Sequence, residues 1–318
     1  MASIGYAMSS EEHRPNDLVR HARRAEEVGF DFALISDHFH PWTDSQGHSP
    51  FVWSVLGGIA QATERLQVGT GVTCPTIRIH PAIIAQAAAT VGTMMPGRFF
   101  LGVGTGENLN EHILGDRWPA HDQRLAMLEE AIEVMRLLWK GGAQTHRGQF
   151  YTVENARIYT LPEEPVPVMV AASGPKAAEA AGRLGEGLIS TAPDKEVVKS
   201  FESAGGKGRP RYGQLTVCWA RDEAEARRTA LKIWPNAGLP GELSQELPMP
   251  AHFEQASKLV TEEKLAEQVV CGPDPKRHIE QIRKFIDAGF DHVYVHQVGP
   301  DQEGFFNFYA EQVLPKLR

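Results

Sequence analysis

Short apolar runs alternate with amphipathic stretches along most of the chain. The first such pair is an apolar run over residues 3–8 and a stretch over residues 15–28, in which apolar side chains recur at the spacing of one helix face. Gly29 follows at a position typical of a helix end. This alternation predicts βα units built on a parallel sheet.

The same alternation continues to the C-terminal end. It predicts further strands over residues 31–36, 66–72, 98–104, 166–172, 187–190, 214–220 and 291–297. It predicts further helices over residues 81–95, 125–139, 174–185, 275–289 and 305–317. About eight strands in one chain favour a closed (β/α)8 TIM barrel over an open, doubly wound sheet.

Two stretches interrupt this rhythm. Residues 141–165 are polar and contain a possible hairpin, and residues 234–260 are rich in proline over their first part. We interpret both as insertions, and residues 234–253 as an irregular loop over the barrel mouth. Residues 1–318 are accordingly expected to form a single barrel domain.

The composition narrows the class of partner. Hydrophobic residues make up 42% of the chain and charged residues 23%, which is ordinary for a globular protein. A net charge of −8 argues against nucleic acid or an anionic membrane and favours a small-molecule substrate. The three cysteines, Cys74, Cys218 and Cys271, are too far apart to suggest a disulfide framework. Without a signal-like N-terminus or a long apolar run, a cytoplasmic location is expected.

In a barrel, the residues that follow the strands converge on the active site. His38 follows the second predicted strand, beside Asp37, and a neutral imidazole there can accept a proton from a substrate hydroxyl. The alternative is a histidine that only hydrogen-bonds a loop. Trp42 and Trp234 stand in proline-containing loops, where an aromatic side chain can form a pocket wall as well as core.

A metal site is a second interpretation of the same loop. Asp37, His38 and His40 resemble the H-x-H motif of metallohydrolase barrels, and His292 and His296 could supply further ligands. That motif normally stands on the first strand, however, so the sequence favours a site without metal.

The glycine-rich run GVGTGEN follows the fourth predicted strand. A dinucleotide fingerprint would need glycine where the chain has Glu107, so that assignment fails. The glycines still permit close approach of a flat ligand, and Glu107 presents a carboxylate beside it or caps the next helix. Ser173 and Gly174 begin a helix directly after a strand, where free N–H groups hold a phosphate or carboxylate or form a plain cap.

These segments resemble a known family. FALISDHFHPW, GTGVTCPTIRIHPAIIAQA, GRFFLGVGTGENLNE, VPVMVAASGP and DHVYVHQ resemble the F420-dependent members of the luciferase-like superfamily. Within it, the resemblance points to the F420-dependent glucose-6-phosphate dehydrogenases and the related alcohol dehydrogenases. It implies a TIM barrel, a homodimer, and coenzyme F420 lying across the C-terminal mouth of the barrel.

The resemblance also implies roles for individual residues. His38 would take the alcohol proton, Trp42 would shape the site, and Glu107 would manage the N1 proton of the deazaflavin. A cis peptide would join Gly71 and Val72. The implied cofactor contacts are Asp37, Gly71, Val72, Thr73, Cys74, Gly106, Glu107, Asn110, Ser173 and Gly174. The implied substrate contacts are His38, Trp42, Trp234 and Gln255.

The chain departs from the sugar-phosphate enzymes where these hold a phosphate. Gln255 aligns with one of their lysines and Glu280 or Gln281 with their arginine, while Lys195 is an uncertain third match. Losing two cations removes charge-assisted bonds, so an uncharged alcohol, sugar or ketone is the better substrate. An FMN-dependent monooxygenase, a metallohydrolase and a non-catalytic binding barrel are the alternative functions.

Overall fold

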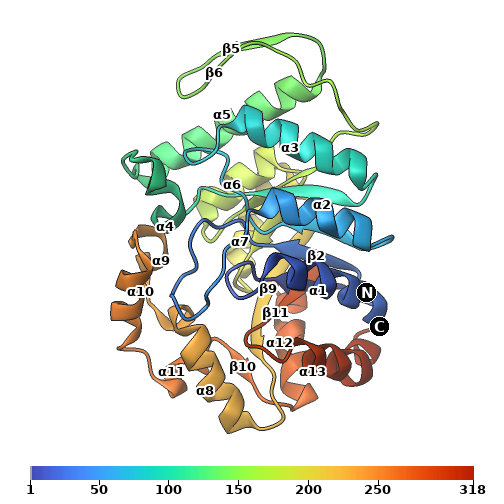
Figure 1. The fold of residues 1–318 in the computed structure, drawn as a ribbon, viewed down its shortest axis with the longest axis vertical. Coiled ribbons are helices and arrows are strands. Elements are labelled where there is room, and N and C mark those ends of the chain that lie inside the picture. The colour runs from blue at the N-terminus through green and yellow to red at the C-terminus, as the bar shows by residue number, and fades with distance from the viewer. Residues whose placement is uncertain (1) are drawn as a thin grey trace.

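Eight parallel strands close into a barrel in the computed structural model, which describes residues 2–318 (Figure 1). The strands are β1 (Ser3–Met8), β2 (Phe32–Ile35), β3 (Gln67–Thr70), β4 (Phe99–Val103), β7 (Val168–Ala171), β8 (Gly187–Ser190), β9 (Arg211–Cys218) and β11 (His292–Gln297). Neighbours pair in parallel, and the pairings of β8 with β9 and of β11 with β1 close the ring. This confirms the predicted (β/α)8 TIM barrel.

Helices cover the outside of this barrel. They are α1 (Pro15–Val28), α2 (Val52–Ala62), α3 (Pro81–Met94), α5 (His121–Trp139), α6 (Pro175–Leu184), α7 (Lys195–Phe201), α8 (Glu223–Ile233), α12 (Pro275–Asp287) and α13 (Gln302–Phe308). Their apolar faces and the outward side chains of the strands form the main hydrophobic cluster. Both chain ends lie on the same side of the barrel (Figure 1).

Aromatic side chains fill the N-terminal end of the barrel interior. Phe32, Phe100 and Tyr212 stand near the starts of their strands, and the Tyr212 ring contacts the rings of the other two. The space for two of these rings comes from glycines, because a Cβ on Gly5 would lie 2.5 Å from Phe32 and one on Gly69 would lie 2.1 Å from Phe100. The N-terminal end is therefore packed, which leaves the C-terminal end for a ligand.

Most predicted elements are present, and several strands, such as β2 and β3, are shorter than expected. The strand predicted over residues 214–220 begins three residues earlier, at Arg211, and the last helix begins at Gln302 and widens into a π-helical turn over Tyr309–Val313. Helix α2 was not predicted, because its sequence VWSVLGGIAQA is apolar on nearly all sides and shows no polar face.

The two stretches that interrupt the rhythm contain regular structure. Strands β5 (Gln144–Arg147) and β6 (Thr152–Ala156) form the antiparallel hairpin that the sequence suggested. The expectation of an irregular loop over residues 234–253 is wrong, since prolines begin two short helices there. Residues 234–271 hold the short elements η3 (Pro235–Gly238), α9 (Leu243–Glu246), α10 (Pro250–Ser257), α11 (Glu262–Leu265) and β10 (Val270–Cys271).

The helices of the described residues include no candidate membrane span. Among those of residues 2–318, none is both long enough and apolar enough to cross a bilayer.

Candidate functional site

A cavity opens at the C-terminal end of the barrel. It encloses about 1240 Å³ of empty space, its open mouth included. Its walls come from the ends of all eight barrel strands and from the loops that follow them. We call it the rim cavity. The sequence-predicted residues among its walls are His38, Trp42, Gly71, Val72, Gly106, Glu107, Ser173 and Trp234.

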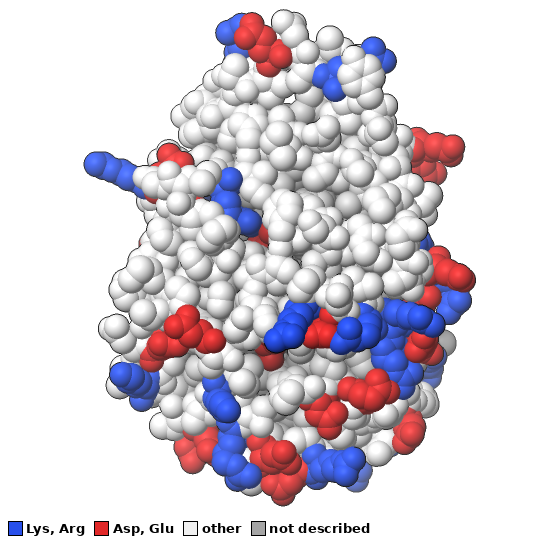
Figure 2. Space-filling view, in the orientation of Figure 1, with Lys and Arg blue, Asp and Glu red and all other residues white. Residues whose placement is uncertain are grey.

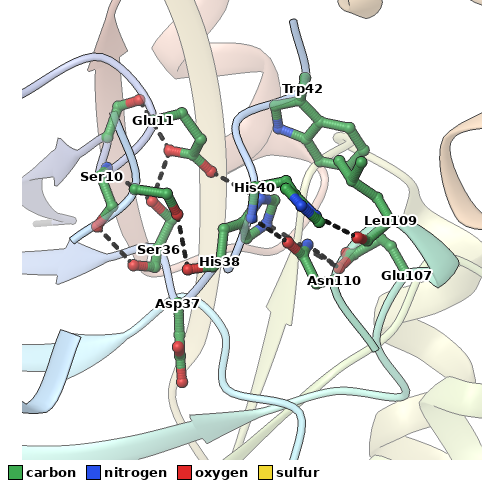
Figure 3. Close-up of polar contacts among 12 residues, drawn as sticks. Ser10, Glu11, Ser36, Asp37, His38, His40, Trp42, Glu107, Leu109 and Asn110 are labelled. Atoms are coloured by element: carbon green, nitrogen blue, oxygen red, sulfur yellow. Dashed lines mark hydrogen bonds and ion pairs between the residues drawn. The ribbon is translucent and has the colours of Figure 1, made fainter. Parts of the chain in front are cut away.

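His38 stands over this cavity against a buried carboxylate, Glu11 (Figure 3). The His38 Nδ1 lies 3.1 Å from Glu11 Oε1, which is an ion-pair distance when the imidazole is protonated, and the contact does not meet the geometry of a hydrogen bond. The second carboxylate oxygen of Glu11 accepts from Ser9 Oγ at 2.9 Å and from Ser36 Oγ at 2.7 Å. Glu11 thus ties the loop after β1 to the loop after β2.

The surroundings of Glu11 favour its charged form. Burial by itself raises the pKa of this carboxyl, yet the nearby His38 and the hydroxyls of Ser36 and Ser9 outweigh it and leave the pKa below its ordinary value. Glu11 is therefore ionised near neutral pH, and an ionised carboxylate stabilises a proton on the imidazole.

Glu107 reaches the same imidazole from the loop after β4. Its Oε2 lies 4.0 Å from His38 Nε2, and the Trp42 ring packs edge-on against His38 with centroids 5.0 Å apart. Asn110 joins the two loops, because its Oδ1 accepts from the backbone N–H of Phe39 at 2.9 Å and its Nδ2 donates to Glu107 at 3.4 Å. The imidazole and the carboxylate therefore meet at one rim, as the sequence predicted.

Several expected cofactor contacts lie behind the cavity wall. Asp37 points away from His38 (Figure 3), because consecutive residues of an extended chain face opposite sides. It pairs with Arg78 at 3.0 Å and accepts from Thr73 at 2.8 Å, while Cys74 contacts Thr76. These residues and Asn110 support the loops and do not line the rim cavity, so their predicted cofactor contacts stay predictions.

A second carboxyl shares Arg78. The Glu111 Oε2 accepts from the Arg78 backbone N–H at 2.9 Å, and its Oε1 lies 3.5 Å from Arg78 Nε. Burial raises the pKa of Glu111 to about 7, although Arg78 opposes the shift. This cluster holds the loop after β3 against the loops after β2 and β4.

Glycines and small side chains predominate in the wall at the ends of β3, β4 and β7. Gly71 and Val72 are joined by the cis peptide that the resemblance implies, and Gly104 and Ala171 continue the surface. Gly106 has a positive φ of 77°, and a Cβ there would lie 2.6 Å from Cys74 Sγ, so the turn requires glycine. Such a wall accommodates a flat ring system.

The start of α6 closes this wall. Ser173 lines the cavity, whereas Gly174 caps the helix without a side-chain hydrogen bond and stands outside the lining. Helix α6 has ten residues, and no side chain satisfies its first N–H groups at the cap. These N–H groups suit an anionic group of a ligand.

Positive charge is missing from the cavity wall. Among residues 2–318, no Lys or Arg belongs to the lining, and Gln255 stays outside it on α10. Lys195, Glu280 and Gln281 likewise contribute nothing to the lining. Gln255 is exposed on α10, so the predicted substrate contact finds no support in the cavity lining.

The ligands of the alternative metal site do not assemble. His292 begins β11 and so lies at the opposite end of the barrel from His38, while His40 Nδ1 contacts Leu109 O at 2.9 Å. Asp37 is held by Arg78. Within residues 2–318, no group of three or more His, Cys, Asp or Glu side chains is arranged to hold a metal ion.

Sequence reasoning missed two groups at the rim. Glu11 stands three residues after the end of β1. Residues at that place in a barrel face the active site, so the position of Glu11 in the sequence was the signal for it. His296, near the end of β11, was considered only as a metal ligand, yet it lines the cavity and pairs with Glu12 at 2.8 Å.

The luciferase-like monooxygenase family matches residues 2–292 of the chain. The chain belongs to this family. The luciferase-like chain is 38% identical to an F420-dependent glucose-6-phosphate dehydrogenase of Microbacterium testaceum, over 99% of its own length and 97% of the relative's. It is 38% identical to the enzyme of that name from Intrasporangium calvum, over 100% and 99% of the two chains.

Solved structures agree with this membership. An F420-dependent secondary alcohol dehydrogenase in complex with an F420-acetone adduct superposes on the luciferase-like chain with a TM-score of 0.92 and 32% identity, covering 100% of this chain and 99% of the other. A coenzyme F420-dependent tetrahydromethanopterin reductase from Methanopyrus kandleri gives a TM-score of 0.82 over 100% and 99% of the chains. Its identity of 21% supports the fold alone.

Proposed function

We propose that this protein is an F420-dependent oxidoreductase that transfers hydride between the deazaflavin and an uncharged alcohol or ketone. The observation that carries the proposal is the meeting of His38, Glu11 and Glu107 at one rim beside a glycine-lined wall. Relatives that span nearly the whole chain are named as F420-dependent dehydrogenases, which agrees with this chemistry.

The residues present suit the cofactor. The wall of Gly71, Gly104 and Ala171 leaves room for a planar ring, and Glu107 stands at its edge. The start of α6 offers N–H groups for an anionic part of the cofactor. When bound, the deazaflavin supplies the two-electron hydride acceptor.

His38 manages the proton of the substrate hydroxyl. With Nδ1 beside the Glu11 carboxylate, the proton of neutral His38 belongs on Nδ1, and Nε2 is free to accept the hydroxyl proton. Glu11 then stabilises the imidazolium, and it does so without leaving its charged state. In the reverse direction His38 returns the proton to the carbonyl oxygen.

The cavity supports an uncharged substrate. A phosphate group would need charge-assisted partners, and among residues 2–318 no Lys or Arg lines the cavity. The two relatives mentioned above are named for glucose 6-phosphate, and we propose that the substrate of this chain differs from theirs in lacking the phosphate. Turnover of F420 with glucose 6-phosphate should be far below turnover with secondary alcohols such as 2-propanol or cyclohexanol.

The deciding experiment pairs the purified protein with each cofactor. Titration of the apo-protein should quench F420 fluorescence with saturable binding, and addition of a secondary alcohol should then reduce the cofactor. An FMN-dependent monooxygenase would instead retain FMN and consume oxygen, and that result would overturn the proposal. Binding of F420 without turnover of any alcohol or ketone would leave only the binding barrel.

We also infer that the protein is a cytoplasmic homodimer, each chain forming one domain over residues 1–318. Helices α2 and α3 carry no charged residue, and few charged side chains lie over them in Figure 2. A groove between them is lined by residues such as Phe51, Trp53 and Ile83. A second copy of this face is the partner that this surface suits best.

A further inference from the structure

Strand β11 brings a second imidazole to the rim cavity. His296 stands two residues after Tyr294, so both share the inward face of the strand, and Tyr294 belongs to the cluster inside the barrel. Both residues line the cavity, and His296 is only 2% exposed. The imidazole therefore lies inside the mouth of the barrel and not on its outer surface.

A buried carboxylate fixes the orientation of this ring. The Glu12 Oε1 lies 2.8 Å from His296 Nε2, and Glu12 Oε2 accepts from the backbone N–H of Gly299 at 2.9 Å. An ionised carboxylate only accepts hydrogen bonds, so Nε2 carries a proton. The other ring nitrogen, Nδ1, is buried and has no hydrogen-bond partner among residues 2–318. An unpaired buried polar atom costs stability, and among residues 2–318 only His38 and His296 both carry such an atom and line the cavity.

This arrangement repeats the one around His38. Trp234 packs edge-on against His296 with centroids 4.4 Å apart, as Trp42 packs against His38 at 5.0 Å. Glu11 and Glu12 follow β1, which lies between β2 and β11. Glu11 therefore contacts His38 on the β2 side, and Glu12 contacts His296 on the β11 side. With one strand between them, β2 and β11 lie about 10 Å apart.

We propose that His296 is a substrate-binding residue, whose Nδ1 pairs with a second oxygen of the substrate several bonds away from the reacting carbinol carbon. This inference rests on the proposed function and specifies its substrate class: uncharged diols, hydroxy ketones or cyclic polyols, in place of simple monoalcohols. A second hydroxyl or carbonyl satisfies the unpaired nitrogen, whereas a monoalcohol leaves it buried without a partner.

The test compares matched alcohols in the F420 reduction assay. Cyclohexanol is compared with the cyclohexane-1,2-, 1,3- and 1,4-diols, and we expect at least one diol to exceed cyclohexanol in kcat/KM by about tenfold. His296→Phe keeps the ring shape without either nitrogen and should bring this ratio close to one. His292→Phe is the control, because it removes an imidazole from the far end of the same strand and should keep the ratio.

A binding measurement without turnover supports the comparison. Calorimetry should show tighter binding of 4-hydroxycyclohexanone than of cyclohexanone to the F420-loaded protein, and His296→Phe should abolish the difference. If that variant does not fold, His296→Gln, which keeps a polar group, takes its place and should change the order of preference among the diols.

The outcomes separate the two proposals. Turnover with no preference for any diol, or a preference that His296→Phe retains, overturns the role of His296 and leaves the proposed function standing. Failure of every alcohol to reduce bound F420 overturns the proposed function and this inference with it.

Discussion

The proposed chemistry depends on which nitrogen of His38 is free. Glu11 occupies the Nδ1 side, so Nε2 faces the cavity and Glu107. Removing the imidazole removes the proton acceptor but none of the glycine-lined wall. We therefore expect His38→Ala to lower kcat by roughly 10²-fold or more, while the dissociation constant of F420 stays within a factor of about three. Stopped-flow reduction and fluorescence titration measure the two quantities, and an unchanged kcat would remove His38 from the mechanism.

Glu11 acts through His38, and the pH profile reveals such a role. Glu11→Gln removes the charge that stabilises the imidazolium, so the free-base form persists to lower pH. The acid limb of the kcat/KM profile should shift to lower pH by about one unit, with a lower maximum because the proton is held less well. Glu130→Gln is the control, since Glu130 pairs with His146 at 3.1 Å, outside the cavity lining. A profile that does not move would show that Glu11 is only structural.

At the scale of single residues, the sequence predicts well which loops carry the chemical side chains. It predicts less well which of these side chains face the cavity. His38 and Glu107 were placed correctly at one rim, because strand ends converge in a barrel. Asp37, a predicted cofactor contact, pairs with Arg78 and does not line the cavity. The strand-end rule does not say which way a loop residue turns, and Arg78 lies 41 positions away in sequence, so the pair could not be read from the local pattern.

Single elements hold buried imidazoles that stay neutral. His13 precedes α1, His21 lies on it, and His278 lies on α12; burial lowers the pKa of each from 6.5 to about 4. His278 shows why the neutral form is preferred, because its ring nitrogens contact Tyr309 Oη at 2.9 Å and Gly272 O at 3.0 Å, one accepting and the other donating.

These histidines predict a loss of stability in mild acid. Between about pH 6.5 and pH 4 the unfolded chain binds three protons that the native histidines do not, so the free energy of unfolding falls as the pH falls. Glu111 offsets one of these three protons. Its pKa is raised to about 7, so above pH 4.5 the native carboxyl binds a proton that the unfolded carboxyl lacks. Two net protons give at most about 2.7 kcal/mol per pH unit.

Urea unfolding near neutral pH and at about pH 5 measures this dependence. His278→Phe should reduce the difference between the two conditions by up to about 1.4 kcal/mol per pH unit, whatever it does to stability at neutral pH. A difference that is equal in the variant and the natural chain would show that His278 titrates normally.

The elements over the barrel mouth were the hardest to predict. Residues 234–260 show little periodicity because their helices are short and are held by contacts from elsewhere. Arg124 of α5, for example, donates to Gln245 of α9 at 3.0 Å, and Gln245 lines the cavity. Long, amphipathic elements such as α1 and α12 were predicted within two residues, since burial of one face leaves its pattern in the sequence.

On the scale of the whole molecule, the charge-poor face over α2 and α3 is the feature that favours a dimer over a monomer. Phe51 is 54% exposed and Ile83 57%, so a single chain leaves large apolar side chains in water at the groove between these helices. A stable dimer buries about 1,600 Å² in total, and exposed apolar side chains such as these are the ones that an interface covers. A dimer would also explain why α2 is apolar on nearly all sides and shows no helical periodicity in the sequence. The barrel would cover one side of the helix and the second subunit the other.

A charge placed in this groove should separate the subunits. Ile83→Asp puts a carboxylate opposite its own copy or an apolar surface, and either arrangement costs several kcal/mol of association free energy. Sedimentation velocity should show a dimer for the natural chain and a monomer for Ile83→Asp.

Leu259→Asp is the control, because Leu259 is 84% exposed, outside the groove, and should leave the dimer intact. A natural chain that sediments as a monomer contradicts the homodimer. Ile83 lies outside the lining of the rim cavity, so the separated Ile83→Asp subunit should still bind F420.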